Sequence, residues 1–92
     1  MKVNYELIRR EIAGETILVP VGAAAMKFTG LITLNEMAAF IWDRIPEAGT
    51  PADITDAILK EYDVTREEAD ADVRELLQTL VKMEILDAEV LA

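Results

Sequence analysis

The chain contains no cysteine, no histidine and no serine. Without cysteine it cannot form a disulfide, a thiolate zinc site or an iron–sulfur cluster held by its own side chains. Without histidine it lacks the commonest general base and metal ligand, and serine and cysteine nucleophiles are missing too. We therefore expect a protein that is not an enzyme and that has no catalytic residue, no metal site and no cofactor of its own.

Long hydrophobic runs are also missing. The longest one, Thr16 to Met26, is too short to cross a bilayer and is interrupted by Pro20 and Gly22. Several glutamates precede it, which makes it a poor core for a signal peptide. These features predict a cytoplasmic protein without membrane contact.

Charge is distributed unevenly along the 92 residues, whose net charge is −9. Residues 1–45 carry five basic and five acidic groups, whereas residues 46–92 carry four basic and thirteen acidic groups. The start of the last predicted helix, Arg66 to Glu75, holds two basic and five acidic residues. Because affinity for nucleic acid rests largely on neutralising phosphates, such a helix would be repelled, and we expect no nucleic-acid partner.

The first third of the chain is rich in β-favouring residues. Alternating and branched residues predict strands over about 5–12 and 16–21, joined by a tight turn at Ala13 and Gly14, and a third strand over 31–34. The stretch from Gly22 to Thr29 indicates a loop, although its three alanines could also form a helical turn. Residues 87–91 could add a short final strand or simply trail.

Three helices are predicted after these strands, over about 36–45, 51–62 and 66–83. Each begins at a residue whose side chain can accept from the free N–H groups of the first turn, namely Asn35, Thr50 and Thr65. Glu68 completes a capping box with Thr65. Strands and helices together describe a winged-helix-like α+β fold, a three-stranded antiparallel sheet followed by three helices, in one domain over residues 1–92.

The third predicted strand is short, apolar and lightly guarded by charge, so its edge could pair with an extended peptide. Apolar burial would have to add to the affinity, which draws attention to Val73 and Leu77 on the last helix. Those two side chains could equally belong to the core alone. Two other functions stay open at this point: a winged-helix regulator or dimerisation module, and a homodimer formed through the free strand edge.

Four segments, together with Thr50 and Ile54, carry a resemblance to a known family. They are Gly30-Leu-Ile-Thr-Leu-Asn-Glu36, Phe40-Ile-Trp42, Leu59-Lys-Glu-Tyr-Asp-Val64 and Asp72-Val-Arg-Glu-Leu-Leu77. Together they resemble the PqqD-like family of precursor-peptide recognition elements, from about Tyr5 to Leu86. Where the family often has Gly-Leu-Leu at the end of the last helix, this chain has Met83-Glu-Ile-Leu86.

The resemblance implies a specific function and site. Members bind the leader segment of a ribosomally made precursor peptide by strand addition and present it to a separate modifying enzyme, often a radical S-adenosylmethionine protein. Transferred to this sequence, the family site implies a peptide-binding set on the third strand, Leu31, Ile32, Thr33 and Leu34. Facing and spacing add four positions of the last helix: Asp70, Val73, Arg74 and Leu77.

Overall fold

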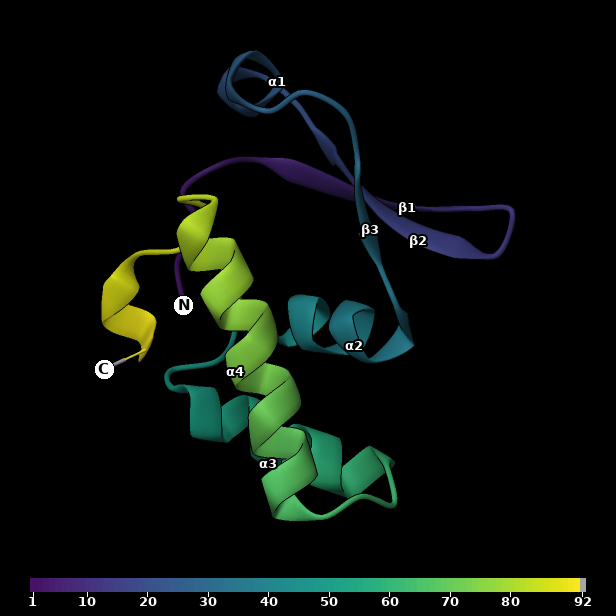
Figure 1. Ribbon diagram of the computed structural model, residues 1–92, viewed down its shortest axis with the longest axis vertical. Coiled ribbons are helices and arrows are strands. Elements are labelled where there is room, and N and C mark those ends of the chain that lie inside the picture. Colours follow the sequence, from purple (N-terminus) through teal and green to yellow (C-terminus); the bar gives the residue numbers. More distant parts are fainter. Residues whose placement is uncertain (92) are drawn as a thin grey trace.

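A computed structural model describes residues 1–91 of the chain. The elements follow one another as β1 (Leu7–Ile12), β2 (Glu15–Pro20), α1 (Ala23–Lys27), β3 (Ile32–Leu34), α2 (Glu36–Arg44), α3 (Pro51–Glu61), α4 (Arg66–Lys82) and a final 3₁₀ turn (Ala88–Leu91) (Figure 1). The strands form one antiparallel sheet in the order β1-β2-β3. The α+β, winged-helix-like fold expected from the sequence is confirmed.

Three details differ from the expectation. The alanine-rich stretch forms the short helix α1, because alanine is the best helix former and three occur in a row. The C-terminal residues 88–91 form a 3₁₀ turn and not a strand. β3 starts at Ile32, so Leu31 lies just before the strand and is 59% exposed.

A two-residue turn sets the register of the sheet. Ala13 and Gly14 both have positive φ, 53° and 82°, which is the backbone of a type I′ hairpin turn. This turn pairs Ile12 with Glu15 and carries the same register through β1 and β2. Since each strand pairs antiparallel with the next, the hairpin also determines how β3 meets β2.

Side-chain caps hold the starts of the helices. The Asn35 side chain accepts from the Ala38 N–H at 2.8 Å, at the point where β3 passes directly into α2. At the start of α4, Thr65 Oγ1 accepts from the Glu68 N–H at 3.1 Å, and the Glu68 carboxylate accepts from the Thr65 N–H at 3.2 Å. Each cap satisfies backbone donors that the helix leaves free, so the boundaries predicted at these residues are sharp.

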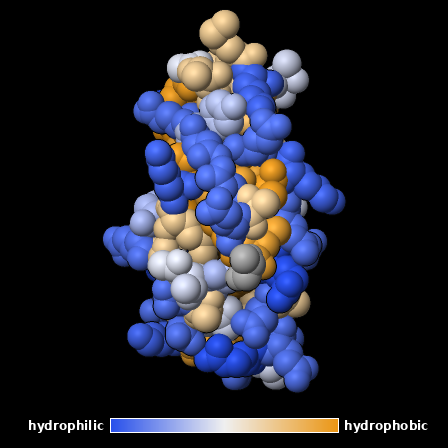
Figure 2. All heavy atoms as spheres, turned by 90° about the vertical axis from the view of Figure 1, so that its left-hand side faces the viewer, coloured by the Kyte–Doolittle hydropathy of each residue, from blue (hydrophilic) through white to orange (hydrophobic). Residues whose placement is uncertain are grey.

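The core lies mainly among the helices. Its largest fully buried side chains come from α2, α3, α4 and the segment that follows: Ile41, Ile45, Ile54, Ile58, Val73, Leu77, Leu80, Ile85 and Leu86. A smaller cluster of Leu18, Leu34 and Ala39 joins the sheet to α2. The face on the side of the C-terminal turn is largely hydrophilic, with hydrophobic atoms visible between the charged side chains (Figure 2). The sheet therefore rests on the helical cluster through β2, β3 and α2.

Candidate functional site

The backbone groups of β2 point alternately toward β1 and toward β3. Just past the end of β2, the Val21 N–H donates to the Glu6 carbonyl at 3.2 Å, so Val21 points toward β1. Because direction alternates along a strand, Thr16 and Leu18 must point the other way, toward β3. Their partners in the register are Leu34 and Ile32.

β3 consequently offers a particular set of backbone groups at its free edge. Ile32 and Leu34 use their N–H and C=O groups on β2, whereas those of Thr33 point outward. We infer the same direction for Leu31, just before the strand, by continuing the alternation one step further. Among the described strands, β3 pairs only with β2. Thr33 and Leu31 are therefore the residues to which a further strand can hydrogen-bond.

The opposite edge of the sheet, on β1, is guarded by charge. By the same alternation, Arg9 and Glu11 expose their backbone groups there, and both side chains are charged. Arg9 is also held in place, since its Nε lies 3.1 Å from Asp43 and its guanidinium lies 3.4 Å from Glu11. Charged side chains are a common protection of strand edges, and the β3 edge has none. Of the two edges, the β3 edge is therefore the one that charged side chains do not protect against strand pairing.

A groove lies between α2 and α4, next to the junction of β3 and α2. We call it the β3–α4 groove; its lining consists of Asn35, Met37, Ala38, Ile41, Asp72, Glu75, Leu76 and Thr79. Leu76 of α4 and Ile32 of β3 pack against the same small cluster, so the groove continues the inner side of β3. Its volume, about 230 Å³, lies below the roughly 300–1,000 Å³ of pockets that enclose drug-sized ligands. It suits individual side chains of a strand.

The helix positions expected at the site lie elsewhere on α4. Asp70, Val73, Arg74 and Leu77 line a second hollow, the α3–α4 pocket, together with Thr50, Pro51, Ala52, Thr55 and Leu91. Val73 and Leu77 are 1% and 0% exposed, and Thr55 donates a 2.7 Å hydrogen bond to Asp70. The structure brings these four residues together, but away from β3. They lie on a different side of α4 from the residues that line the β3–α4 groove, because successive helical residues turn by about 100°.

The α4 residues that do face the groove were not singled out from the sequence. Asp72, Leu76 and Thr79 follow one another at spacings of four and three, and Glu75 lies beside them. Such spacing places residues on one face of a helix. This stripe is visible in the sequence, but only the packing of α4 shows that it is the stripe next to β3.

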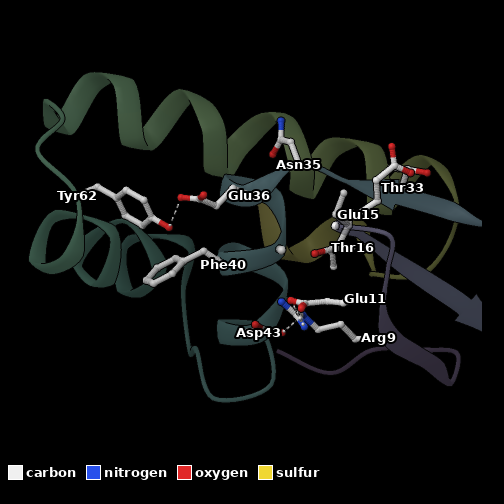
Figure 3. Close-up of a pocket in the computed structure, with 13 residues that line it drawn as sticks. Arg9, Glu11, Glu15, Thr16, Thr33, Asn35, Glu36, Phe40, Asp43 and Tyr62 are labelled. Atoms are coloured by element: carbon white, nitrogen blue, oxygen red, sulfur yellow. Dashed lines mark hydrogen bonds and ion pairs between the residues drawn. The ribbon is translucent and has the colours of Figure 1, made fainter.

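A third hollow lies between the hairpin and α2. Its lining is polar, and several of its side chains form ion pairs or hydrogen bonds with one another (Figure 3). Arg9 reaches toward Asp43 and Glu11 on one side, and the Tyr62 hydroxyl donates to Glu36 at 3.3 Å on the other. Partial removal of water, reinforced by the charge of Glu36, raises the pKa of Tyr62. Four of its five charged groups, all except Glu15, already have partners, so this hollow is less suited than the β3–α4 groove to receive a peptide.

Two further features concern residues 1–91. None of the helices there combines the length and the hydrophobicity needed to span a bilayer. In the same range, no three side chains of the metal-ligating types converge on one point.

The fold and its β3 edge define a small winged-helix-like module with one uncharged strand edge beside a helix-lined groove. The model of one family, coenzyme PQQ synthesis protein D (PqqD), matches residues 15–86. The chain therefore belongs to the PqqD family.

Two solved structures are similar to this chain. TbiB1, in complex with the TbiA(beta) leader peptide, has 27% sequence identity and a TM-score of 0.71, over 96% of each chain. A lasso peptide synthetase B1, complexed with the leader peptide, has 23% identity and a TM-score of 0.67, over 88% of this chain and 89% of that one; this second likeness shows the shared fold. A search of curated proteins found no match.

Proposed function

We propose that this chain binds the leader segment of a ribosomally made precursor peptide as a strand added to β3. It then presents the peptide to a separate modifying enzyme, such as a radical S-adenosylmethionine protein. The observation that carries the proposal is the uncharged free edge at Leu31 and Thr33, beside the β3–α4 groove. Membership in the PqqD family and the similarity to TbiB1, a protein solved with a leader peptide, support it.

Hydrogen bonds at the β3 edge and apolar burial in the groove are both needed to offset the free-energy cost of association. The outward N–H and C=O groups of Leu31 and Thr33 offer about four hydrogen bonds, worth roughly 1 kcal/mol each. Association costs on the order of 4–15 kcal/mol, so backbone pairing alone would not hold a peptide. Burial of about 150 Å² of apolar surface adds roughly 4 kcal/mol, and the groove is where that burial can occur.

The proposed site therefore keeps the strand residues and changes the helix residues. On the strand it consists of Leu31, Ile32, Thr33 and Leu34, and on α4 of Asp72, Glu75, Leu76 and Thr79 in place of Asp70, Val73, Arg74 and Leu77. In this role the chain recognises and delivers its peptide in the cytoplasm, and the partner enzyme supplies the chemistry together with any cofactor.

Amide hydrogen exchange tests the proposal residue by residue. The probe is the leader segment of the precursor encoded next to this protein, added as a synthetic peptide. We expect exchange at the Leu31 and Thr33 amides to slow by at least about tenfold, because they gain hydrogen bonds. The Ile32 and Leu34 amides, already bonded within the sheet, should change much less. A peptide that binds while Leu31 and Thr33 exchange as before would contradict strand addition.

The free edge also favours a second candidate, pairing of β3 with β3 of another copy. Sedimentation velocity with and without the peptide separates the two. A homodimer that the peptide dissociates means that both use the edge, whereas a dimer that survives saturating peptide means that the copies meet elsewhere.

A further inference from the structure

The lining of the β3–α4 groove is charged with one sign only. It contains two carboxylates, Asp72 and Glu75, and no lysine or arginine. The other two hollows described above each contain both signs: Asp70 with Arg74 in the α3–α4 pocket, and Arg9 among carboxylates beside the hairpin. The groove is thus a local region of negative charge beside the open strand edge.

Neither groove carboxylate forms an ion pair or accepts a hydrogen bond within the part of the chain that the structure describes. Over residues 1–91, the ion pairs involve Glu11, Asp43, Asp56 and Glu84, and neither Asp72 nor Glu75 takes part in one. Their side chains also accept no hydrogen bond from the described residues, in contrast to the capping carboxylates of Asp53 and Glu68. Both groups are exposed and open to a partner.

The floor of the groove, in contrast, is apolar. Met37, Ala38 and Ile41 come from α2, and Leu76 lies one turn after Asp72 on α4. A side chain that enters the groove therefore meets apolar surface at the bottom and carboxylates at the α4 rim. Aliphatic side chains with a cationic end match this arrangement, because their stems bury on apolar surface while their heads remain near charge and water.

Strand and helix spacings limit how many side chains the groove receives. Alternate residues of a strand point to the same side, about 6.6 Å apart. The stripe from Asp72 to Thr79 covers seven residues of α4, or roughly 10 Å at 1.5 Å per residue. An added strand therefore places about two of its side chains, two residues apart, along the stripe.

We infer that the leader peptide of this protein carries a lysine or arginine in its β3-pairing segment, with an apolar residue two positions away. The cationic head lies against Asp72 and Glu75, and the apolar side chain lies over Met37, Ile41 and Leu76. The inference rests on the proposed function and adds the class of peptide sequence that the site accepts. Apolar burial supplies affinity, and the charge match selects among peptides and sets their register.

A positional-scanning library of blocked peptides of about ten residues tests this, with affinities measured by fluorescence anisotropy. Binding by strand addition is identified by its loss in the Thr33→Pro variant. At one position we expect lysine or arginine to bind about 2- to 5-fold more tightly than norleucine, an effect typical of an exposed ion pair. In the double variant D72N/E75Q this ratio should fall to about one, while the apolar preference two positions away persists.

A charge-matched variant controls for the overall charge of −9, which attracts any cationic peptide. The control is D63N/E47Q, which removes one aspartate and one glutamate from exposed positions outside the groove. Neither carboxylate takes part in an ion pair within residues 1–91. This control should keep the full preference for lysine or arginine.

The outcomes separate the inference from the proposed function. Library peptides that bind with sensitivity to Thr33→Pro but show no cationic preference overturn the inference and leave strand addition standing. The inference is also overturned if the preference for lysine or arginine persists in D72N/E75Q. The same holds if the control D63N/E47Q reduces that preference as much as D72N/E75Q does. If no library peptide shows binding that depends on Thr33, the proposed function fails and the inference fails with it.

Discussion

The two sides of α4 contribute differently to the protein. On one side Val73 and Leu77 are almost completely buried and hold α4 in the core. On the other side Asp72, Glu75 and Thr79 are exposed and Leu76 is half-buried, and together they form one wall of the β3–α4 groove. A single helix thus supplies buried side chains to the core and one wall of the groove in which we propose that a peptide binds. The rotation of α4 about its axis decides which residues do which.

This difference separates changes that unfold the protein from changes that affect recognition alone. Substitutions on the buried side should lower the free energy of unfolding, and those on the groove side should lower peptide affinity. Neighbouring residues can fall in different classes, as Leu76 and Leu77 do. Four predictions test this division.

The largest effect is expected for Leu77→Ala. Leu77 is 0% exposed in the main core, so its truncation leaves a cavity and should lower the free energy of unfolding by about 2–5 kcal/mol. Urea denaturation monitored by circular dichroism measures this. At low temperature, the fraction that remains folded should bind peptide with unchanged affinity. Weakened binding by that folded fraction would place Leu77 at the site after all.

Thr33→Pro comes next and acts on recognition. Proline removes the outward N–H of Thr33, and its ring obstructs an approaching strand, so peptide affinity should fall about tenfold or more. Isothermal titration gives the change. Because this N–H makes no bond to β2, the stability of the sheet should change little.

Two matched variants accompany it. Thr33→Val keeps the N–H and the β-branched shape, and should bind normally. Glu11→Pro introduces the same backbone change at the opposite free edge, on β1, and should also bind normally. Equal losses from Thr33→Pro and Glu11→Pro would mean that the two edges do not differ in function.

A smaller loss of affinity is expected for Leu76→Ala. This side chain is half-buried in the groove wall, and truncating it removes apolar contact with the peptide, for an expected loss of about 3- to 10-fold. Stability should fall far less than in Leu77→Ala. Peptide titration and urea denaturation of both variants compare the two sides of α4 directly. If Leu76→Ala lowered mainly stability and Leu77→Ala lowered mainly affinity, the assignment of the buried and groove sides would be wrong.

The smallest effect concerns pH and the start of α3, beside the α3–α4 pocket. Hydrogen bonds from the backbone N–H groups of Thr50 and Gly49 lower the pKa of Asp53 below its usual 3.8. A lowered folded pKa stabilises the protein above the unfolded pKa, and the stabilisation is lost as the pH falls through the folded value.

Thermal denaturation between pH 5 and pH 2 tests this. Between pH 5 and pH 2, Asp53→Asn should lose less stability than the unmodified protein, because the asparagine side chain does not titrate. Peptide affinity at pH 7 should be unaffected, since Asp53 is outside the groove. An identical pH profile for the two proteins would show that Asp53 makes no such contribution.

Local patterns in the sequence predicted most of the fold. Asn35, Thr65 and the Ala13-Gly14 turn mark boundaries through interactions within a few residues, and the structure confirms them. The alanine-rich stretch was ambiguous because its propensity favours a helix while its neighbours favour a loop. The short third strand was expected over 31–34, and the structure begins it one residue later, at Ile32.

The candidate site could be predicted only in part. The strand edge was identified because a short, uncharged run between a glycine and a helix cap is visible in the sequence itself. The groove side of α4 was not singled out, since Val73 and Leu77 attract attention by being apolar and are buried for that same reason. In the sequence, the stripe of Asp72, Leu76 and Thr79 on α4 looks like an ordinary solvated helix face. Only the structure shows that this stripe lies beside α2 and β3.

By itself, the sequence determined the three strands and the three longer helices, the residues that cap those helices, and that the chain has no thiol, imidazole or serine hydroxyl for catalysis. These properties depend on residue type and on contacts within a turn or two. Only the tertiary structure decided which side of α4 faces β3 and that Thr33, and not Ile32, presents its backbone at the free edge. Both depend on long-range packing and register, because 100° of helix rotation or one residue of strand shift exchanges the inner and outer positions.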